Sequence, residues 1–254
     1  MSPIPTYVVN LPEDEDRLQI LLGQLDPSIF EIRESLGFLG RTLPDTACLL
    51  LTGDPASIQY KGALGVMFSH VSLWERIAQL QAPFALVLED DVELIQPERL
   101  AGVELPDGFD IVFCGDQTAV HPVGTKPIRR LQCISAIWVL SALERRGVSV
   151  GAYGYLLSPS GARRLLSLFD QHRFFGHVDV RMMAYCCELR ELNRLPSTGR
   201  LLEELRAIRG IVGDPPKLAG YALMHPLVVH SGMTSRRDRE DMLGKMPAHE
   251  TDPE

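Results

Sequence analysis

The sequence has no long apolar run, no excess of basic charge and no paired cysteine motif. Although 45% of its 254 residues are hydrophobic, polar residues interrupt them well before the roughly 20 apolar residues that a membrane-spanning helix requires. The formal net charge of −8 argues against nucleic acid as a partner, because non-specific binding depends on clustered Lys and Arg. These absences predict an ordinary globular protein without a transmembrane segment.

Basic residues do cluster locally, at Arg129-Arg130, at Arg163-Arg164 and at Arg236-Arg237 with Arg239. Such clusters suit phosphates or an anionic membrane surface, but solvated helix faces and a charged chain end explain them equally well. A peripheral membrane contact is therefore left open.

The cysteines are five in number and none belongs to a Cys-x-x-Cys pair. This pattern argues against a disulfide framework and a structural zinc site, and it favours reduced cysteines in the core. The first residues also lack the basic and apolar segments of a secretory signal. We therefore expect a cytoplasmic protein.

The length suits one large α/β domain, which we expect to be a catalytic domain at residues 1–235. Residues 236–254 are highly charged and short of apolar side chains. We expect this C-terminal tail to be poorly ordered.

A buried strand that ends in three acids is the most informative stretch of the chain. Residues 84–88 are five consecutive apolar residues, typical of a strand covered on both faces, and Glu89, Asp90 and Asp91 follow at once. Adjacent carboxylates at the edge of a core repel one another and need a counter-charge, for which Mg²⁺ or Mn²⁺ is well suited. In an extended chain Glu89 and Asp91 share one face and Asp90 takes the other. A solvated acidic turn is the alternative.

Strand and helix patterns alternate along the rest of the chain, which predicts an α/β fold. Strands are expected at residues 7–11, 110–114, 151–157 and 223–231, and the apolar run at 134–140 also suits a strand. Helices are expected after Asp14, from Leu64, after Ser158-Pro159 and after Asp179. Between residues 31 and 58 we expect mostly loop.

Asn10 and Arg17 follow the first strand, where an α/β sheet binds ligands. They are candidates for holding a nucleotide base or phosphate, although a turn residue and a surface arginine are the commoner roles. His70, beside Ser69 on a largely apolar helix, is by residue type more often a core histidine than a catalyst.

Three further polar residues stand next to predicted elements. Asp179 lies at the start of a helix, where an aspartate is commonly an N-cap. Asp116 follows the strand at 110–114, and His230 lies at the exit of the last strand.

Several of these stretches occur together in one order, namely Val8-Val9-Asn10-Leu11 with Arg17, Gly62-x-x-Gly65-x-x-x-Ser69-His70, Ala85 to Val92, Tyr155 to Ala162, and Val178-Asp179. This combination resembles glycosyltransferase family 25, the lipooligosaccharide galactosyltransferases, over roughly residues 7–231. Ala63 and Val66 depart from the Gly-Glu-Ile-Gly-Cys pattern of that family. The departure bears on the choice of donor or acceptor rather than on the fold.

The resemblance implies a GT-A type nucleotide-sugar transferase fold, with a mostly parallel central sheet flanked by helices, and inversion at the anomeric carbon. It implies Mn²⁺ or Mg²⁺ between Asp91 and the donor diphosphate, with Glu89 or Asp90 holding metal-bound water or the ribose. By the same similarity, Asn10, Arg17, Ser69 and His70 contact the nucleotide sugar.

An inverting transfer also needs a base for the acceptor hydroxyl, for which Asp179 is our first choice and Asp116 the second. His230 is a candidate to complete the metal shell beside Asp91 and Glu89, because neutral imidazole is an acceptable manganese ligand.

The function expected from the resemblance is metal-dependent transfer of a hexose, galactose first, from a UDP-sugar to an acceptor hydroxyl on a bacterial glycan or another saccharide. A metal-dependent phosphohydrolase and a nucleotide-sugar-binding protein without transferase activity are the alternatives. Turnover of the donor without an acceptor distinguishes the first, and metal-dependent binding without product distinguishes the second.

Overall fold

The computed structural model describes residues 2–116, 132–146, 150–173, 176–195, 199–213 and 215–232. The predicted tail at 236–254 and the Arg129-Arg130 and Arg236-Arg239 clusters lie outside these residues. Among the described residues, no helix is both long and apolar enough to cross a bilayer.

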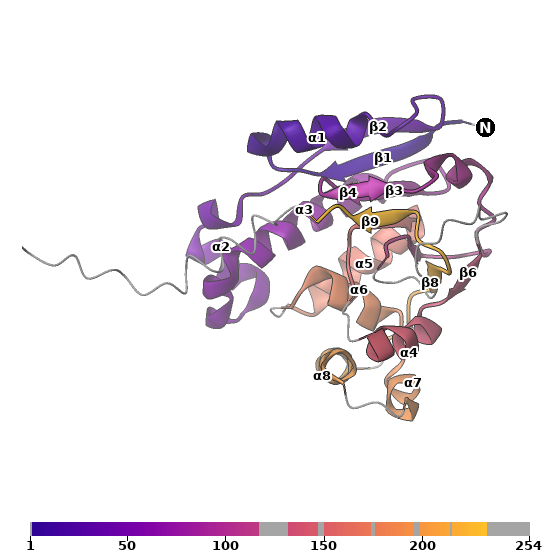
Figure 1. Cartoon of the computed structure of the whole chain (residues 1–254). Helices are drawn as coiled ribbons and strands as arrows, with labels where there is room; N and C mark the ends of the chain where they lie inside the picture. The colour runs from indigo at the N-terminus through magenta and orange to yellow at the C-terminus, as the bar shows by residue number, and fades with distance from the viewer. Residues whose placement is uncertain are drawn as a thin grey trace, which may run out of the picture.

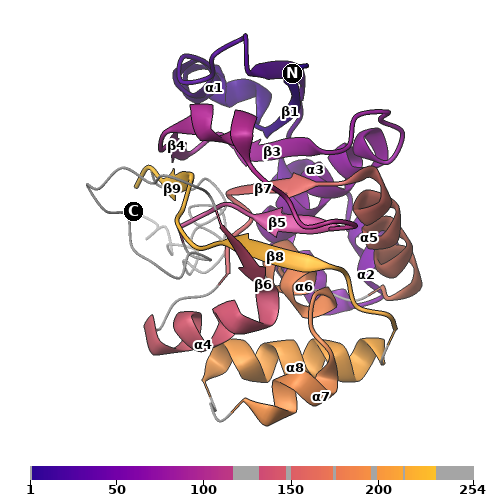
Figure 2. The ribbon, with the colours of Figure 1, turned by 90° about the vertical axis from the view of Figure 1, so that its right-hand side faces the viewer.

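The fold is built around a seven-stranded sheet in the order β2-β1-β3-β7-β5-β8-β6 (Figures 1 and 2). Its strands are β1 (Ile4–Val9), β2 (Phe30–Ser35), β3 (Ala85–Glu89), β5 (Ile111–Phe113), β6 (Cys133–Ser135), β7 (Gly154–Leu157) and β8 (Gly220–Leu223). Only β7 and β6 run antiparallel to their neighbours. The sheet is therefore mostly parallel by strand direction, as predicted.

A separate two-stranded ribbon pairs β4 (Val92–Leu94) with β9 (Val228–His230) in antiparallel register. The helices are α1 (Glu15–Leu22), α2 (Asp45–Thr52), α3 (Lys61–Ile77), α4 (Ala136–Arg146), α5 (Pro159–Gln171), α6 (Val178–Tyr185), α7 (Leu189–Arg194) and α8 (Arg200–Val212). Short 3-10 turns lie at Pro12–Asp14, Gly40–Thr42, Pro55–Tyr60 and Pro97–Gly102.

Strand β3 lies between two hydrophobic layers. Ala85 and Val87 join the larger cluster, which is formed with α3, α5, α6 and α8, whereas Leu86 and Leu88 join the smaller cluster on the side of α1. All four side chains are fully buried. Successive side chains of a strand point to opposite faces, so a continuous apolar run is what a doubly covered strand requires. The prediction of an α/β fold with helices flanking the sheet is confirmed (Figure 2).

The start of α5 follows from local chemistry. Ser158 precedes the helix in an extended conformation, and its Oγ accepts a hydrogen bond from the Gly161 N–H at 3.0 Å. Pro159 occupies the first turn, where a missing N–H costs no intrahelical hydrogen bond. The helix predicted after Ser158-Pro159 is confirmed.

Three expectations about secondary structure were wrong. The stretch from 31 to 58, expected to be mostly loop, contains most of β2 and all of α2. Strand β2 is an edge strand with exposed polar positions, and α2 buries only Cys48 and Thr52. Neither element therefore has a strong apolar pattern in the sequence. The apolar run at 134–140 is mainly the start of α4, because such a run does not distinguish a strand from a buried helix. The last predicted strand is divided between β8 and β9.

The first turns of α3 lie against the loop at residues 37–40. A side chain at Gly65 would place its Cβ 2.5 Å from the Phe38 carbonyl oxygen, and one at Gly40 would lie 2.0 Å from the Lys61 carbonyl oxygen. Ser69 fixes the same loop, since its Oγ accepts a hydrogen bond from the Phe38 N–H at 2.9 Å and donates one to the Gly65 carbonyl at 2.8 Å. The Gly-x-x-Gly-x-x-x-Ser spacing therefore holds this loop against the helix.

We predict that Gly65→Ala destabilises the protein by about 1–3 kcal/mol, because the backbone must shift to admit a methyl group. Gly210→Ala is the matched control, since Gly210 lies in α8 with nothing within 4 Å of the added methyl. The control is expected to be neutral or to stabilise by up to about 1 kcal/mol. Urea unfolding of both variants measures the difference; equal effects of the two substitutions would contradict the close packing at Gly65.

Candidate functional site

The acidic run lies at the carboxyl ends of two neighbouring parallel strands. Strand β1 pairs with β3, and Val9 is aligned with Glu89. Asn10 therefore lies beside the acids, and its Nδ2 donates hydrogen bonds to Asp90 Oδ2 at 2.7 Å and to the Asp14 carbonyl at 3.0 Å. Sites at this edge of a parallel sheet are typical of ligand binding in α/β proteins.

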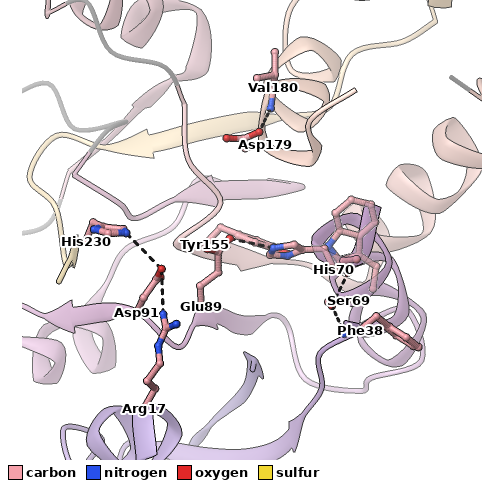
Figure 3. Close-up of polar contacts among 12 residues, drawn as sticks. Arg17, Phe38, Ser69, His70, Glu89, Asp91, Tyr155, Asp179, Val180 and His230 are labelled. Atoms are coloured by element: carbon pink, nitrogen blue, oxygen red, sulfur yellow. Dashed lines mark hydrogen bonds and ion pairs between the residues drawn. The ribbon is translucent and has the colours of Figure 1, made fainter. Parts of the chain in front are cut away.

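Arg17 supplies the positive charge closest to the acids. Its Nη2 lies 2.8 Å from Asp90 Oδ1 and 3.3 Å from Asp91 Oδ2. Arg17 lies on α1, and its side chain reaches from that helix to Asp91 (Figure 3). Arg17 was predicted near the nucleotide; in the structure its contacts are to the two carboxylates.

Asp91 is the most electrostatically perturbed of the three acids. Only 6% of its surface is exposed. Burial raises its pKa to about 6, with Glu89 adding to the increase and His230 and Arg17 acting against it. Burial also raises the pKa of Asp90, while Asn10 and Arg17 lower it. Desolvation therefore outweighs the nearby positive charge at both carboxyls.

His230 is brought to Asp91 by the two-stranded ribbon. Val92 of β4 is paired with His230 of β9, and the Ser231 N–H donates to the Asp91 carbonyl at 2.9 Å. As a result His230 Nε2 lies 3.4 Å from Asp91 Oδ2 (Figure 3). His230 was predicted to complete a metal shell with Asp91, and the structure brings the two residues together although they are far apart in the chain.

The chemistry of a divalent cation fits Asp91 and His230. Asp91 Oδ1 is buried and has no hydrogen-bond partner in the described part of the chain, so this oxygen is a candidate ligand. Among the described residues, no three His, Cys, Asp or Glu side chains are grouped as a ready-made metal site. Glu89, the third predicted ligand, instead contacts His70. The pair therefore suits Mg²⁺ or Mn²⁺ only as an ion that takes its other ligands from water and substrate phosphates.

A cleft opens directly over the acids. It is partly open to solvent and has the acidic run as one wall and the loop at 37–40 as another. Asn10, Arg17, Gly62 and Val66 also line it. A cleft at the carboxyl ends of parallel strands is where α/β proteins usually bind ligands.

Ser69 and His70, predicted to contact the nucleotide sugar, are 1% and 0% exposed. The Ser69 hydroxyl is engaged with the loop at 37–40. The His70 ring lies 2.8 Å from the Tyr155 hydroxyl and 3.3 Å from Glu89. Ser69 thus lines the cleft with its hydroxyl engaged by the loop, whereas His70 acts on the cleft through Glu89.

Tyr153 is the site residue that the sequence analysis missed. It immediately precedes β7, its carbonyl accepts a hydrogen bond from the Glu89 N–H at 2.9 Å, and its ring centre lies 5.2 Å from that of His230. Its pKa is raised by burial and then by the negative charges of four acids, Glu89, Asp116, Asp179 and Asp91. The fold thus brings four of the five predicted acids within electrostatic range of one phenol. The only signal in the sequence was a tyrosine among glycines at the start of the strand predicted at 151–157, and we gave that stretch a structural role only.

Asp179 lies in the first turn of α6, on a different element from the metal candidates (Figure 3). Its Oδ1 accepts a hydrogen bond from the Val180 N–H at 2.8 Å, which orients the carboxylate. Asp116 follows β5 and shares the neighbourhood of Tyr153. Both positions are compatible with the base role proposed from the sequence.

We predict that Asp91→Asn changes the pH dependence of stability. Because the pKa of Asp91 rises from 3.8 to about 6 on folding, ionisation of this group weakens the folded state as pH increases between these values. The variant should match the wild type near pH 4 and exceed it by about 3 kcal/mol above pH 7. Urea unfolding at both pH values measures this, and an Asn variant that loses stability relative to the wild type as pH rises would contradict the assignment.

Three comparisons with known proteins show what the chain is similar to. Residues 3–101 match the family described as Glycosyltransferase family 25 (LPS biosynthesis protein), a stretch that contains β1, α3, β3 and the acidic run. A glycosyltransferase 25 family member from Anopheles gambiae is 29% identical over 177 residues, which is 63% of this chain and 28% of the relative. Human procollagen galactosyltransferase 2 is 25% identical over 170 residues, covering 63% and 27%.

The chain thus spans less than a third of the length of the curated relatives that it matches. Among solved structures, a glycosyltransferase involved in glycosylation of the major capsid of PBCV-1 covers 96% of this chain at 9% identity, with a TM-score of 0.38. That score is too low to support an argument about the site. Residues 3–101 are thus similar to glycosyltransferase family 25, and the named relatives from that family match a longer part of the chain.

Proposed function

We propose that the protein is a metal-dependent, inverting glycosyltransferase that moves a hexose from a UDP-sugar to an acceptor hydroxyl. The observation that carries this proposal is the buried Asp91, which lines the cleft beside His230 and whose Oδ1 has no hydrogen-bond partner among the described residues. Galactose is the first candidate for the sugar, because a relative is named as a procollagen galactosyltransferase. The family description, LPS biosynthesis protein, makes a bacterial glycan the first candidate for the acceptor.

In this proposal the nucleotide lies in the cleft, and its diphosphate lies beside the acids. Two phosphates bring negative charge to a place that already contains Asp90 and Asp91, so binding requires compensating positive charge. Arg17 provides part of that charge. Asp91 and His230 would hold Mn²⁺ or Mg²⁺, which when bound supplies charge stabilisation for the leaving diphosphate.

The transfer itself is a single displacement. The acceptor oxygen forms a bond to the anomeric carbon while the bond from that carbon to the diphosphate oxygen breaks. The acceptor proton passes to Asp179, and the nucleoside diphosphate leaves with the bonding electrons. Val180 N–H orients the Asp179 carboxylate through its hydrogen bond, and Asp116 is the second candidate for the base.

The donor is tested by thermal unfolding of the protein with a panel of nucleotide sugars, each with and without Mn²⁺. A donor that binds the folded state raises the melting temperature by mass action, and about 100 times its Kd stabilises by about 2.7 kcal/mol. We expect UDP-galactose or UDP-glucose to do so, and more strongly with Mn²⁺. No shift with any donor in either condition would refute the proposed function.

The base is tested by Asp179→Asn, which keeps the size of the side chain and removes its basicity. We predict a fall in kcat of at least about hundredfold, the range typical of a lost general base, with donor binding retained. Asp170→Asn is the matched control, because Asp170 lies in α5 with 77% of its side chain exposed and pairs only with nearby Arg173 among the described residues. Transfer that is unchanged in Asp179→Asn would exclude this residue as the base.

A further inference from the structure

A chain of hydrogen bonds runs from the core to the cleft through four side chains. Trp74 Nε1 lies 2.8 Å from the Tyr155 hydroxyl, that hydroxyl lies 2.8 Å from His70 Nδ1, and His70 Nε2 lies 3.3 Å from Glu89 Oε1. Trp74, Tyr155 and His70 are fully buried, whereas 21% of the Glu89 side chain is exposed. Glu89 is therefore the only member of the chain that reaches the cleft.

The donors and acceptors fix the direction of this chain. The indole N–H of Trp74 only donates, so the Tyr155 oxygen accepts from it. The Tyr155 proton then points to His70 Nδ1, its other partner among the described residues. With Nδ1 accepting, the His70 proton is on Nε2 and is donated to Glu89. The reverse arrangement would leave the buried Tyr155 proton without an acceptor, which is costly.

This arrangement separates Glu89 from the cation candidates. Asp91 lies beside His230 and Arg17, and Asp90 lies beside Asn10 and Arg17. Glu89 contacts neither Arg17 nor His230 in the described structure; it is held by His70. Its backbone N–H is bonded to Tyr153, the residue around which Asp91 and Asp179 also gather. Glu89 therefore lies on the β7 side of the acidic run, between the proposed diphosphate site and the proposed base.

The group that occupies this position in a bound nucleotide sugar is the transferred sugar, whose hydroxyls are hydrogen-bond donors. We propose that Glu89 accepts a hydrogen bond from a hydroxyl of that sugar, and that His70 and Tyr155 are positioning residues that hold the Glu89 carboxylate for this contact. The inference rests on the proposed function, and it reassigns Glu89 from metal binding to sugar recognition. It also gives buried His70 a role that needs no contact with the nucleotide.

The test compares binding of UDP and of UDP-galactose, each with Mn²⁺, by calorimetry on wild-type protein, His70→Phe, His70→Gln and Tyr155→Phe. Glutamine places an amide N–H near the position of Nε2, so it should restore the bond to Glu89, whereas phenylalanine cannot. We expect UDP affinity to stay within about twofold in every variant. UDP-galactose affinity should fall roughly tenfold or more in His70→Phe and Tyr155→Phe, the scale of one hydrogen bond to a charged group, and recover in His70→Gln.

Tyr185→Phe is the matched control for losing a buried phenol. Tyr185 is fully buried, and its hydroxyl accepts a hydrogen bond from Arg181 at 2.9 Å, away from the cleft walls. It should leave both affinities unchanged. If His70→Phe does not fold, Tyr155→Phe decides the question, since it removes a single oxygen.

Equal losses of UDP and UDP-galactose affinity would overturn the inference, because they would make Glu89 a ligand of the nucleotide or of the cation. Unchanged UDP-galactose affinity in folded His70→Phe and Tyr155→Phe would overturn it as well. Both results leave the proposed function intact. Wild-type protein that binds neither UDP nor UDP-galactose would instead refute the proposed function, and the inference with it.

Discussion

Negative charge gathers where β3 leaves the core, and the rest of the site is arranged to make that charge tolerable. Asp91 is nearly buried beside two other acids, and burial alone raises the free energy of its ionised form. Arg17 reaches both aspartates, Asn10 donates to Asp90, and His230 lies against Asp91. Even so, one Asp91 oxygen has no hydrogen-bond partner among the residues that the structure describes. Compensation of the charge by these residues is therefore incomplete, which is the basis for proposing a bound cation.

The three acids are treated differently although they are consecutive. Glu89 contacts His70, Asp90 contacts Asn10 and Arg17, and Asp91 contacts the same Arg17 and His230. Strand β3 ends at Glu89, and Asp90 and Asp91 lie in the turn that follows. In the proposed function, these three acids would serve the sugar, the nucleotide side and the cation respectively. This division of roles is more specific than an alternating strand would have allowed.

Local features of the fold could be predicted from the sequence. The apolar run of β3 and the Ser158-Pro159 start of α5 depend on neighbouring residues, and both were predicted correctly. The edge strand β2 was missed because exposed positions remove its apolar pattern. The site acids could be named individually, since carboxylates after a strand are visible in the sequence.

The contacts of the site could not be predicted in the same way. Arg17 meets Asp90 only because β1 and β3 are adjacent in this register. Tyr153 meets His230 only because the start of β7 lies beside the end of β9. The burial of His70 depends on packing of α3 against β7, through Tyr155. Such long-range contacts decide whether a polar residue touches a ligand itself or positions another residue that touches it.

Electron paramagnetic resonance of Mn²⁺ tests the central claim most directly, because the spectrum of the ion changes when protein side chains bind it. The account predicts that wild-type protein with UDP gives a protein-bound Mn²⁺ spectrum, and that Asp91→Asn removes it while the protein stays folded. A spectrum identical in wild type and Asp91→Asn, or UDP binding that proceeds equally well without any divalent ion, would contradict the claim that these carboxylates hold a cation for a diphosphate.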